Sequence, residues 1–258
     1  MATGMESSDR LRSILVAIAT TATIAFNILA ATGYVNGVIP KEISDHYPTI
    51  LTPAAYAFSI WSLIYLGIAV FSVLQLLPPN LARFRNFRTL YIVSCFLNCA
   101  WLYFWHHNHP AICLVLMAVL ALTLLLLVAR FTATETAGMR IAKITFGLYA
   151  GWVTVAALVN LFVVFTAFEI GFSGTVLDIL GVVAIAAASM IALFVAQKFR
   201  NYLFSLAVAW ALTAIAINQS GNTAVVVATA IGVIVTLLSA LSFIIYLPMA
   251  KIPQNQNE

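Results

Sequence analysis

Long, predominantly apolar stretches recur along the whole chain, and this recurrence constrains the fold more than any other feature. A helix of about 20 apolar residues spans the hydrocarbon core of a bilayer. Only 8% of the 258 residues are charged, whereas soluble domains carry about 25%. The sequence therefore predicts an all-α, polytopic membrane helical bundle, because a spanning segment must satisfy its backbone hydrogen bonds internally.

The apolar stretches divide the chain into about eight transmembrane helices, of which the seventh is short. We expect helices at residues 11–32, 54–77, 87–105, 110–131, 139–165, 175–199, 202–217 and 224–246. Residues 1–165 would hold five of them. Residues 166–258 would hold three additional transmembrane helices and a short cytoplasmic tail.

The basic residues divide unevenly between the two sides of the membrane when eight helices are threaded through it. With the N-terminus on one side, eleven of the twelve Lys and Arg residues, Lys251 included, fall on that side, and only Lys41 falls on the other. The positive-inside rule then predicts that both termini are cytoplasmic. The basic residues are scattered singly in loops, so nucleic-acid binding is not expected.

An aromatic face follows the polar loop that ends at Pro53. Tyr56, Phe58, Trp61 and Tyr65 come at the start of the second predicted helix. Positions 58, 61 and 65 are spaced i, i+3 and i+7, so these three rings should share one side of the helix. This face is the best candidate for a binding site. An aromatic belt with ordinary interhelical packing would give the same pattern.

Three amides lie at membrane depth, and such groups usually face the interior of a bundle. Asn98 and Asn160 could either fix the packing of helices or contact a ligand. For Asn27 we favour a packing role. Trp101 follows Asn98 by three residues and should lie on the same face. Trp105 lies closer to the helix end, and we interpret it as a belt residue.

His106, His107 and His109 form the densest histidine cluster of the chain. Three imidazoles could coordinate a metal or a haem iron. Acidic partners are not evident nearby in the sequence, so a solvated turn before Pro110 is the favoured interpretation. We predict no metal site, and whether these histidines bind a metal stays an open question.

Three spaced motifs resemble those of the TspO/MBR family, the tryptophan-rich sensory proteins. Residues 61–65 (WSLIY), eight residues after Pro53, are similar to the Pro-then-W-x-x-x-Y pattern of the family's second helix. Residues 98–101 (NCAW) resemble the N-x-x-W of its third helix. Residues 152–160 (WVTVAALVN) resemble the W…A…LN of its fifth helix.

The resemblance implies a five-helix bundle with an apolar pocket for porphyrins, sterols or similar flat hydrophobic ligands. Aromatic side chains would stack on the ligand and amides would orient its polar edge. The expected ligand-binding residues are Trp61, Tyr65, Asn98, Trp101, Trp152, Asn160, Tyr56 and Phe58. A porphyrin or haem is the candidate ligand, membrane lipids are expected neighbours, and a homodimer is an open alternative because dimers are common in the family.

The chain also departs from typical members of the family. It has about three more helices than the usual five, and its first loop contains no tryptophan, only Tyr34 and Tyr47 as aromatic rings. Residues 36–49 (NGVIPKEISDHYPT) and 52–61 (TPAAYAFSIW) resemble a longer, mostly bacterial branch of the family, which implies the bacterial cytoplasmic (inner) membrane. The missing loop tryptophans argue against porphyrin photodegradation.

Two further function classes stay open beside a binding or sensory protein. The tripeptide Phe-Arg-Asn occurs at residues 84–86 and 199–201, which would fit two four-helix halves of a small-solute transporter. An enzyme is less favoured. The sequence contains no G-x-S-x-G or H-E-x-x-H motif and no convincing nucleophile or acid–base pair.

Overall fold

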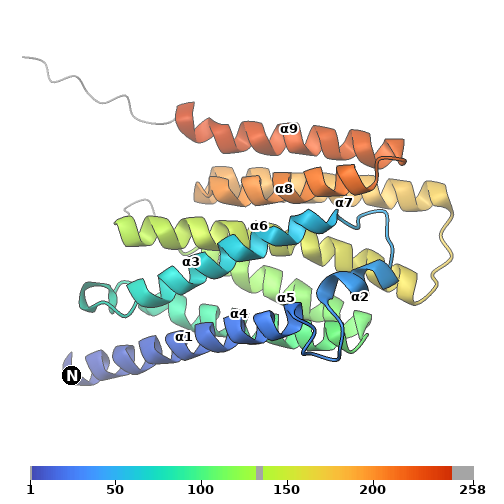
Figure 1. The fold of residues 1–258 in the computed structure, drawn as a ribbon. Coiled ribbons are helices and arrows are strands. Elements are labelled where there is room, and N and C mark those ends of the chain that lie inside the picture. The colour runs from blue at the N-terminus through green and yellow to red at the C-terminus, as the bar shows by residue number, and fades with distance from the viewer. Residues whose placement is uncertain (1, 132–135, 246–258) are drawn as a thin grey trace, which may run out of the picture.

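The computed structural model describes residues 2–131 and 136–245, and every regular element in these two ranges is helical. Most helices run antiparallel to their chain neighbours in one elongated bundle (Figure 1). The elements are α1 Ala2–Ala31, α2 Pro40–His46, η1 Ala55–Ser59, α3 Ile60–Leu74, η2 Pro78–Asn80, α4 Arg85–His106, α5 Pro110–Val128, α6 Ala137–Ala167, α7 Gly174–Phe199, α8 Tyr202–Asn218 and α9 Thr223–Ile245. The tail predicted after residue 245 lies outside the described residues.

Seven of the described helices are long and apolar enough to cross a membrane. They are α1, η1 with α3, α4, α5, α6, α7 and α9. The seventh predicted helix, at residues 202–217, corresponds to α8, which has 17 residues and is shorter. At about 1.5 Å per residue, α8 extends over about 25 Å. It packs against α6, α7 and α9, which bury most of its surface. The fold is the expected polytopic helical bundle.

The start of α1 and the end of α9 lie at the same end of the bundle (Figure 1). The ends of α3, α5 and α7 and the starts of α4, α6 and α8 lie there too, and we call this the basic end. The described basic residues at this end are Arg10, Arg12, Arg83, Arg85, Arg88, Arg130, Arg140, Lys143, Lys198 and Arg200. Lys41, on α2, lies at the opposite end, which we call the α2 end. Lys251 lies outside the described residues.

The helix α1 begins nine residues earlier than predicted because its first turns are anchored to α4. Asp9, only 4% exposed, accepts hydrogen bonds from Arg85 Nε at 2.9 Å and from Arg88 Nη1 at 3.3 Å. Arg88 is fully buried and also donates to Gln75 Oε1 at 2.9 Å and to the Leu81 carbonyl at 2.7 Å. This network compensates the buried charges and ties α1, α3 and α4 together at the basic end.

The loop before the second membrane helix contains the short helix α2, which the hydrophobic pattern did not predict. Pro40 occupies its first turn, and the Glu42 carboxylate accepts a hydrogen bond from the backbone N–H of Ile39 at 2.9 Å. Both features favour a helix start. The second membrane helix then begins as the 3₁₀ segment η1 and continues as α3.

The helices α7, α8 and α9 lie along one side of the bundle, next to α6 (Figure 1). The helix α8 also contacts the segment before α3, because the Ala54 N–H donates to the Ala214 carbonyl at 3.0 Å and Trp210 Nε1 donates to the Ala57 carbonyl at 3.1 Å. To look for a repeat of two four-helix halves, we compare α1, α3, α4 and α5 with α6, α7, α8 and α9. The contacts of α1 with α4 and of α4 with α5 then correspond to those of α6 with α8 and of α8 with α9. The two halves do not correspond fully. The helix α7 packs on α9, whereas the equivalent helices α3 and α5 have no comparable contact among the described residues.

Candidate ligand-binding site

Trp61 lies at the centre of an aromatic cluster formed by α3 and α6. Its ring stacks on Tyr65 with centroids 5.4 Å apart, and it meets Tyr149 edge-to-face at 5.7 Å and Trp152 at 6.5 Å. Phe58 packs edge-to-face on Trp152 at 6.0 Å. Rings in these geometries attract one another beyond their burial of apolar surface. The two motifs that contain Trp61 and Trp152 therefore meet in one cluster.

Two cavities adjoin this cluster. One, which we call the inner cavity, has a volume of about 50 Å³ and lies against the predicted residues Phe58, Trp61, Trp101, Trp152 and Asn160. The other, the side cavity, has a volume of about 310 Å³. Its wall includes Tyr65 from α3 and Asn27 from α1. Phe58, Trp61 and Trp101 line both, so their rings form the partition between the two cavities.

The polar groups near the inner cavity belong to α4 and α6. The Trp101 Nε1 donates a hydrogen bond to Asn160 Oδ1 at 3.2 Å, and Asn160 Nδ2 donates to the Ala156 carbonyl at 2.9 Å. Trp101 and Asn160 are 8% and 4% exposed. The amide of Asn160 is therefore held in one orientation beside the cavity.

The other two amides pair with each other across α1 and α4. Asn27 Nδ2 donates to Asn98 Oδ1 at 2.8 Å, and the Tyr65 hydroxyl donates to Asn27 Oδ1 at 2.7 Å. Asn98 is 1% exposed and lines neither cavity. Asn27, for which we favoured packing, makes this packing contact and also lines the side cavity. The structure thus brings seven of the eight predicted residues into one region. Six of them line the two cavities, and the seventh, Asn98, lies behind the cavity wall and bonds to Asn27.

Tyr56 is the predicted residue that lies apart from the others. Its ring packs edge-to-face on Trp210 at 5.2 Å, and 40% of its surface is exposed. It lines neither the inner nor the side cavity.

The interpretation of Trp105 as a belt residue was wrong. Trp105 is 6% exposed, stacks on Trp101 with centroids 5.7 Å apart and lines the inner cavity. Its Nε1 donates to the Pro40 carbonyl at 3.3 Å, which links α4 to α2. The i, i+4 spacing from Trp101 was the available signal for this shared face.

Several residues of the aromatic cluster and of the inner cavity carried no clear sequence signal. Tyr149 lies one turn before Trp152 and contacts Trp61, a spacing that the motif comparison did not use. Met117 comes from α5, and Ala211 and Ile215 come from α8. We expected the pocket to lie among the first five membrane helices. The inner cavity extends beyond them, because α8 supplies part of its wall.

The histidine cluster does not converge on one point. His106 is fully buried with Nδ1 2.8 Å from the Leu102 carbonyl, whereas His107 is half-buried and stacks on Tyr103. Residues 2–131 and 136–245 contain no group of three or more His, Cys, Asp or Glu side chains arranged to hold a metal ion.

A larger cavity, of about 720 Å³, lies at the α2 end and contains none of the eight predicted residues. We call it the outer cavity. It is bounded by the segment 44–52 and by the ends of α6, α7 and α8.

The comparisons with known proteins agree with the three motifs. The family model described as TSPO-like protein matches residues 13–243, a range that includes α7, α8 and most of α9. Comparison with curated proteins and with solved structures gave no match. Because the match covers most of the chain and the fold is a bundle of membrane-spanning length, this multi-pass membrane protein belongs to the TSPO-like family, as its resemblance to TspO/MBR proteins predicted.

Proposed function

We propose that this protein binds a flat hydrophobic ligand, of the porphyrin or sterol type, among its tryptophans. The observation that carries the proposal is the placement of Phe58, Trp61 and Trp101 between two adjoining cavities. Rings that partition a small cavity from a larger one can contact a planar ligand on its faces and edges. The family membership supports the same ligand class.

The side cavity is the part of this region with room for a ligand. Ligand pockets usually measure about 300–1,000 Å³, and the side cavity, at about 310 Å³, reaches this range. The inner cavity, at about 50 Å³, does not. A planar ligand would therefore occupy the side cavity and extend into the inner cavity only when the Trp61 ring rotates.

The polar groups have distinct roles in this proposal. Asn27 and the Tyr65 hydroxyl line the side cavity, so they would orient the polar edge of the ligand. Asn160 would do the same in the inner cavity, whereas Asn98 would hold Asn27 in place. In the described residues, no histidine or cysteine lines either cavity, which favours stacking over ligation of a haem iron.

Tryptophan fluorescence offers a direct test because four of the five tryptophans line the inner cavity and Trp210 does not. We would titrate the protein in nanodiscs with protoporphyrin IX, and with a fluorescent sterol in a second series. The proposal expects saturable quenching in the wild type, weakened about tenfold or more in Trp61→Ala and Trp152→Ala.

Trp210→Phe is the matched control. It removes an indole from the same protein without touching either cavity, so its affinity for protoporphyrin IX should equal that of the wild type. Linear quenching that is the same in all variants and in empty nanodiscs would mean that the ligand partitions into lipid. The proposed site would then be wrong.

A small-solute transporter is the second candidate. The contacts α6–α8 and α8–α9 repeat those of α1–α4 and α4–α5, which favours two related halves. The missing counterpart of the α7–α9 contact weighs against a full repeat, so we rank transport second. Uptake of a solute by proteoliposomes, with no saturable binding of protoporphyrin IX, would reverse this order.

The same proposal sets the protein in the membrane with its basic end in the cytoplasm. Ten described basic residues lie at that end and Lys41 at the other, which is the asymmetry of the positive-inside rule. The α2 end, with the outer cavity, would then face the outside of the bacterial inner membrane.

A further inference from the structure

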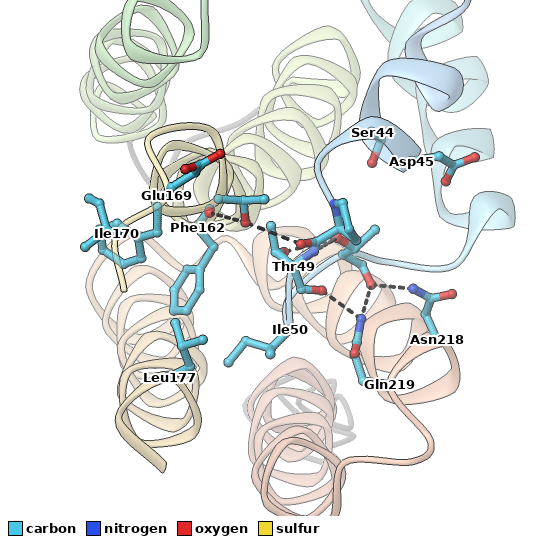
Figure 2. A pocket seen from close by; sticks show the side chains of 14 residues that line it. Ser44, Asp45, Thr49, Ile50, Phe162, Glu169, Ile170, Leu177, Asn218 and Gln219 are labelled. Atoms are coloured by element: carbon cyan, nitrogen blue, oxygen red, sulfur yellow. Dashed lines mark hydrogen bonds between the residues drawn. The ribbon is translucent and has the colours of Figure 1, made fainter. Parts of the chain in front are cut away.

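The outer cavity shares Ser44 with the inner cavity but contains none of the rings of the aromatic cluster. Figure 2 shows its side chains, which come from the segment 44–52, the end of α6, the start of α7 and the end of α8. Its volume of about 720 Å³ suits a small organic ligand better than a bare ion.

The wall formed by residues 48–52 is held in place by side chains from α6, from the last residue of α8 and from the residue that follows it. Gln219 Nε2 donates to the Thr49 carbonyl at 3.0 Å and to the Thr52 carbonyl at 3.3 Å, and Asn218 Nδ2 donates to Thr52 at 3.1 Å. Thr166 Oγ1 donates to the Pro48 carbonyl at 3.3 Å. These bonds, drawn in Figure 2, fix the position of residues 48–52 at the wall of the cavity. They also engage both amide N–H donors of Gln219 and one of the two donors of Asn218 in contacts within the protein.

The charges that face the cavity are negative. Asp45 and Glu169 lie on opposite sides of it (Figure 2). The Asp45 carboxylate is paired with Lys41, one turn earlier on α2. The Glu169 carboxylate has no hydrogen-bond or ion-pair partner among the described residues, and no Lys, Arg or His lines the cavity. Glu169 therefore leaves one uncompensated negative charge at the rim.

The remaining wall of the outer cavity is apolar. Its large apolar side chains are Ile50, Phe162, Phe165, Ile170 and Leu177. Phe165 meets Phe162 edge-to-face with centroids 5.4 Å apart. An apolar group can thus bury surface against the ends of α6 and α7 while a charged head stays near Glu169 at the rim.

We propose that the outer cavity is a second ligand site, for an amphiphilic amine, whose ammonium group pairs with Glu169 and whose apolar body lies against Phe165, Ile170 and Leu177. A cavity of ligand size, an unpaired carboxylate, engaged amide donors and an apolar wall together select this class. The site goes beyond the tryptophan-lined cavities, and it gives α7 and α8 a function in ligand binding.

The test uses the full protein in nanodiscs and 2-(1-naphthyl)ethylamine as the probe, with isothermal titration against empty nanodiscs. The matched neutral probe is 2-(1-naphthyl)ethanol, which has the same apolar body and no charge. We expect saturable binding of the amine and at least about tenfold weaker binding of the alcohol, since a hydrogen bond to a charged group contributes this much.

Two variants separate charge from shape. Glu169→Gln keeps the size of the side chain, removes its charge and should weaken amine binding about tenfold or more. Leu177→Trp fills the apolar part of the cavity and should weaken both probes. Glu42→Gln is the matched control, because Glu42 lies at the same end but outside the lining, and Gln can still accept the hydrogen bond from Ile39.

Two outcomes would overturn the proposal. One is equal affinity for the amine and the alcohol, and the other is an amine affinity that Glu169→Gln leaves unchanged. Neither outcome affects the proposed porphyrin or sterol site, because Glu169 lines neither of its cavities. Protoporphyrin IX quenching should be the same in Glu169→Gln as in the wild type, and this measurement also shows that the variant is folded.

Discussion

The indole of Trp101 and the amide of Asn160 are joined by a hydrogen bond of 3.2 Å between α4 and α6. These two residues belong to two of the motifs by which the sequence resembles the TspO/MBR family. Both side chains are buried and both line the inner cavity. The pair therefore connects the packing of the two helices with the shape of the candidate site.

This pair should show a measurable coupling. In a double-mutant cycle with Trp101→Phe and Asn160→Ala, we expect a coupling free energy of about 0.6 kcal/mol, typical of interhelical hydrogen bonds in membranes. Reversible unfolding in mixed detergent micelles would measure it. Trp210→Phe with Asn160→Ala is the control pair and should be additive, because the two side chains do not interact. A coupling of zero for Trp101 and Asn160 would contradict the assignment.

The buried Arg88 should contribute far more to stability than an exposed arginine at the same end. Arg88→Leu leaves Gln75 Oε1 and the Leu81 carbonyl without their buried donor, so we expect a loss of at least about 2 kcal/mol. Arg140→Leu removes one positive charge from the basic end but affects an exposed side chain with no partner of this kind. Its melting temperature should match the wild type. Equal melting temperatures for both variants would refute the network's role.

Much of the fold could be predicted from hydrophobic length alone, because a bilayer permits few alternatives. The predicted helix at residues 110–131 appears as α5, with the same start at Pro110. The N-terminal extension of α1 and the helix α2 could not be predicted in this way. They depend on Asp9 meeting Arg85 and Arg88, and on a local capping contact at Glu42.

The candidate site could be predicted only where it coincides with the motifs. Trp61, Trp101 and Trp152 were found because each belongs to a motif that resembles the TspO/MBR family, and helical spacing supported Trp61 and Trp101. Ala211 and Ile215 of α8 were not found, since apolar residues on a membrane helix give no sign of which neighbour they face. The outer cavity was not predicted from the sequence, for another reason. Its lining comes from four separate segments, and no local pattern brings Glu169 near Gln219.

The close contact of α6 with α8 should depend on Gly151. A Cβ atom at this position would lie 2.5 Å from the Phe204 carbonyl oxygen and 2.9 Å from Ala207 Cβ. Gly151→Ala should therefore separate the helices and cost about 1–3 kcal/mol, which a lower melting temperature in detergent would show.

Gly138 on the same helix provides the control for Gly151. Its added Cβ would have no neighbour closer than 3.8 Å. Gly138→Ala should leave the melting temperature unchanged or raise it slightly, because Ala restricts the unfolded chain. If both variants melted at the wild-type temperature, the tight packing of α8 on α6 would be disproved.

Labelling of single introduced cysteines should reveal opposite exposures for the two ends of the bundle. In right-side-out membrane vesicles, a membrane-impermeant maleimide should react with Lys41→Cys directly, because Lys41 is exposed at the α2 end. Lys198→Cys, exposed at the basic end, should react only after permeabilisation. The wild-type protein is the control, since Cys95 and Cys113 are buried and Cys99 is half-buried inside the bundle. The reverse pattern would place the basic end outside and refute the orientation that the positive-inside rule predicts.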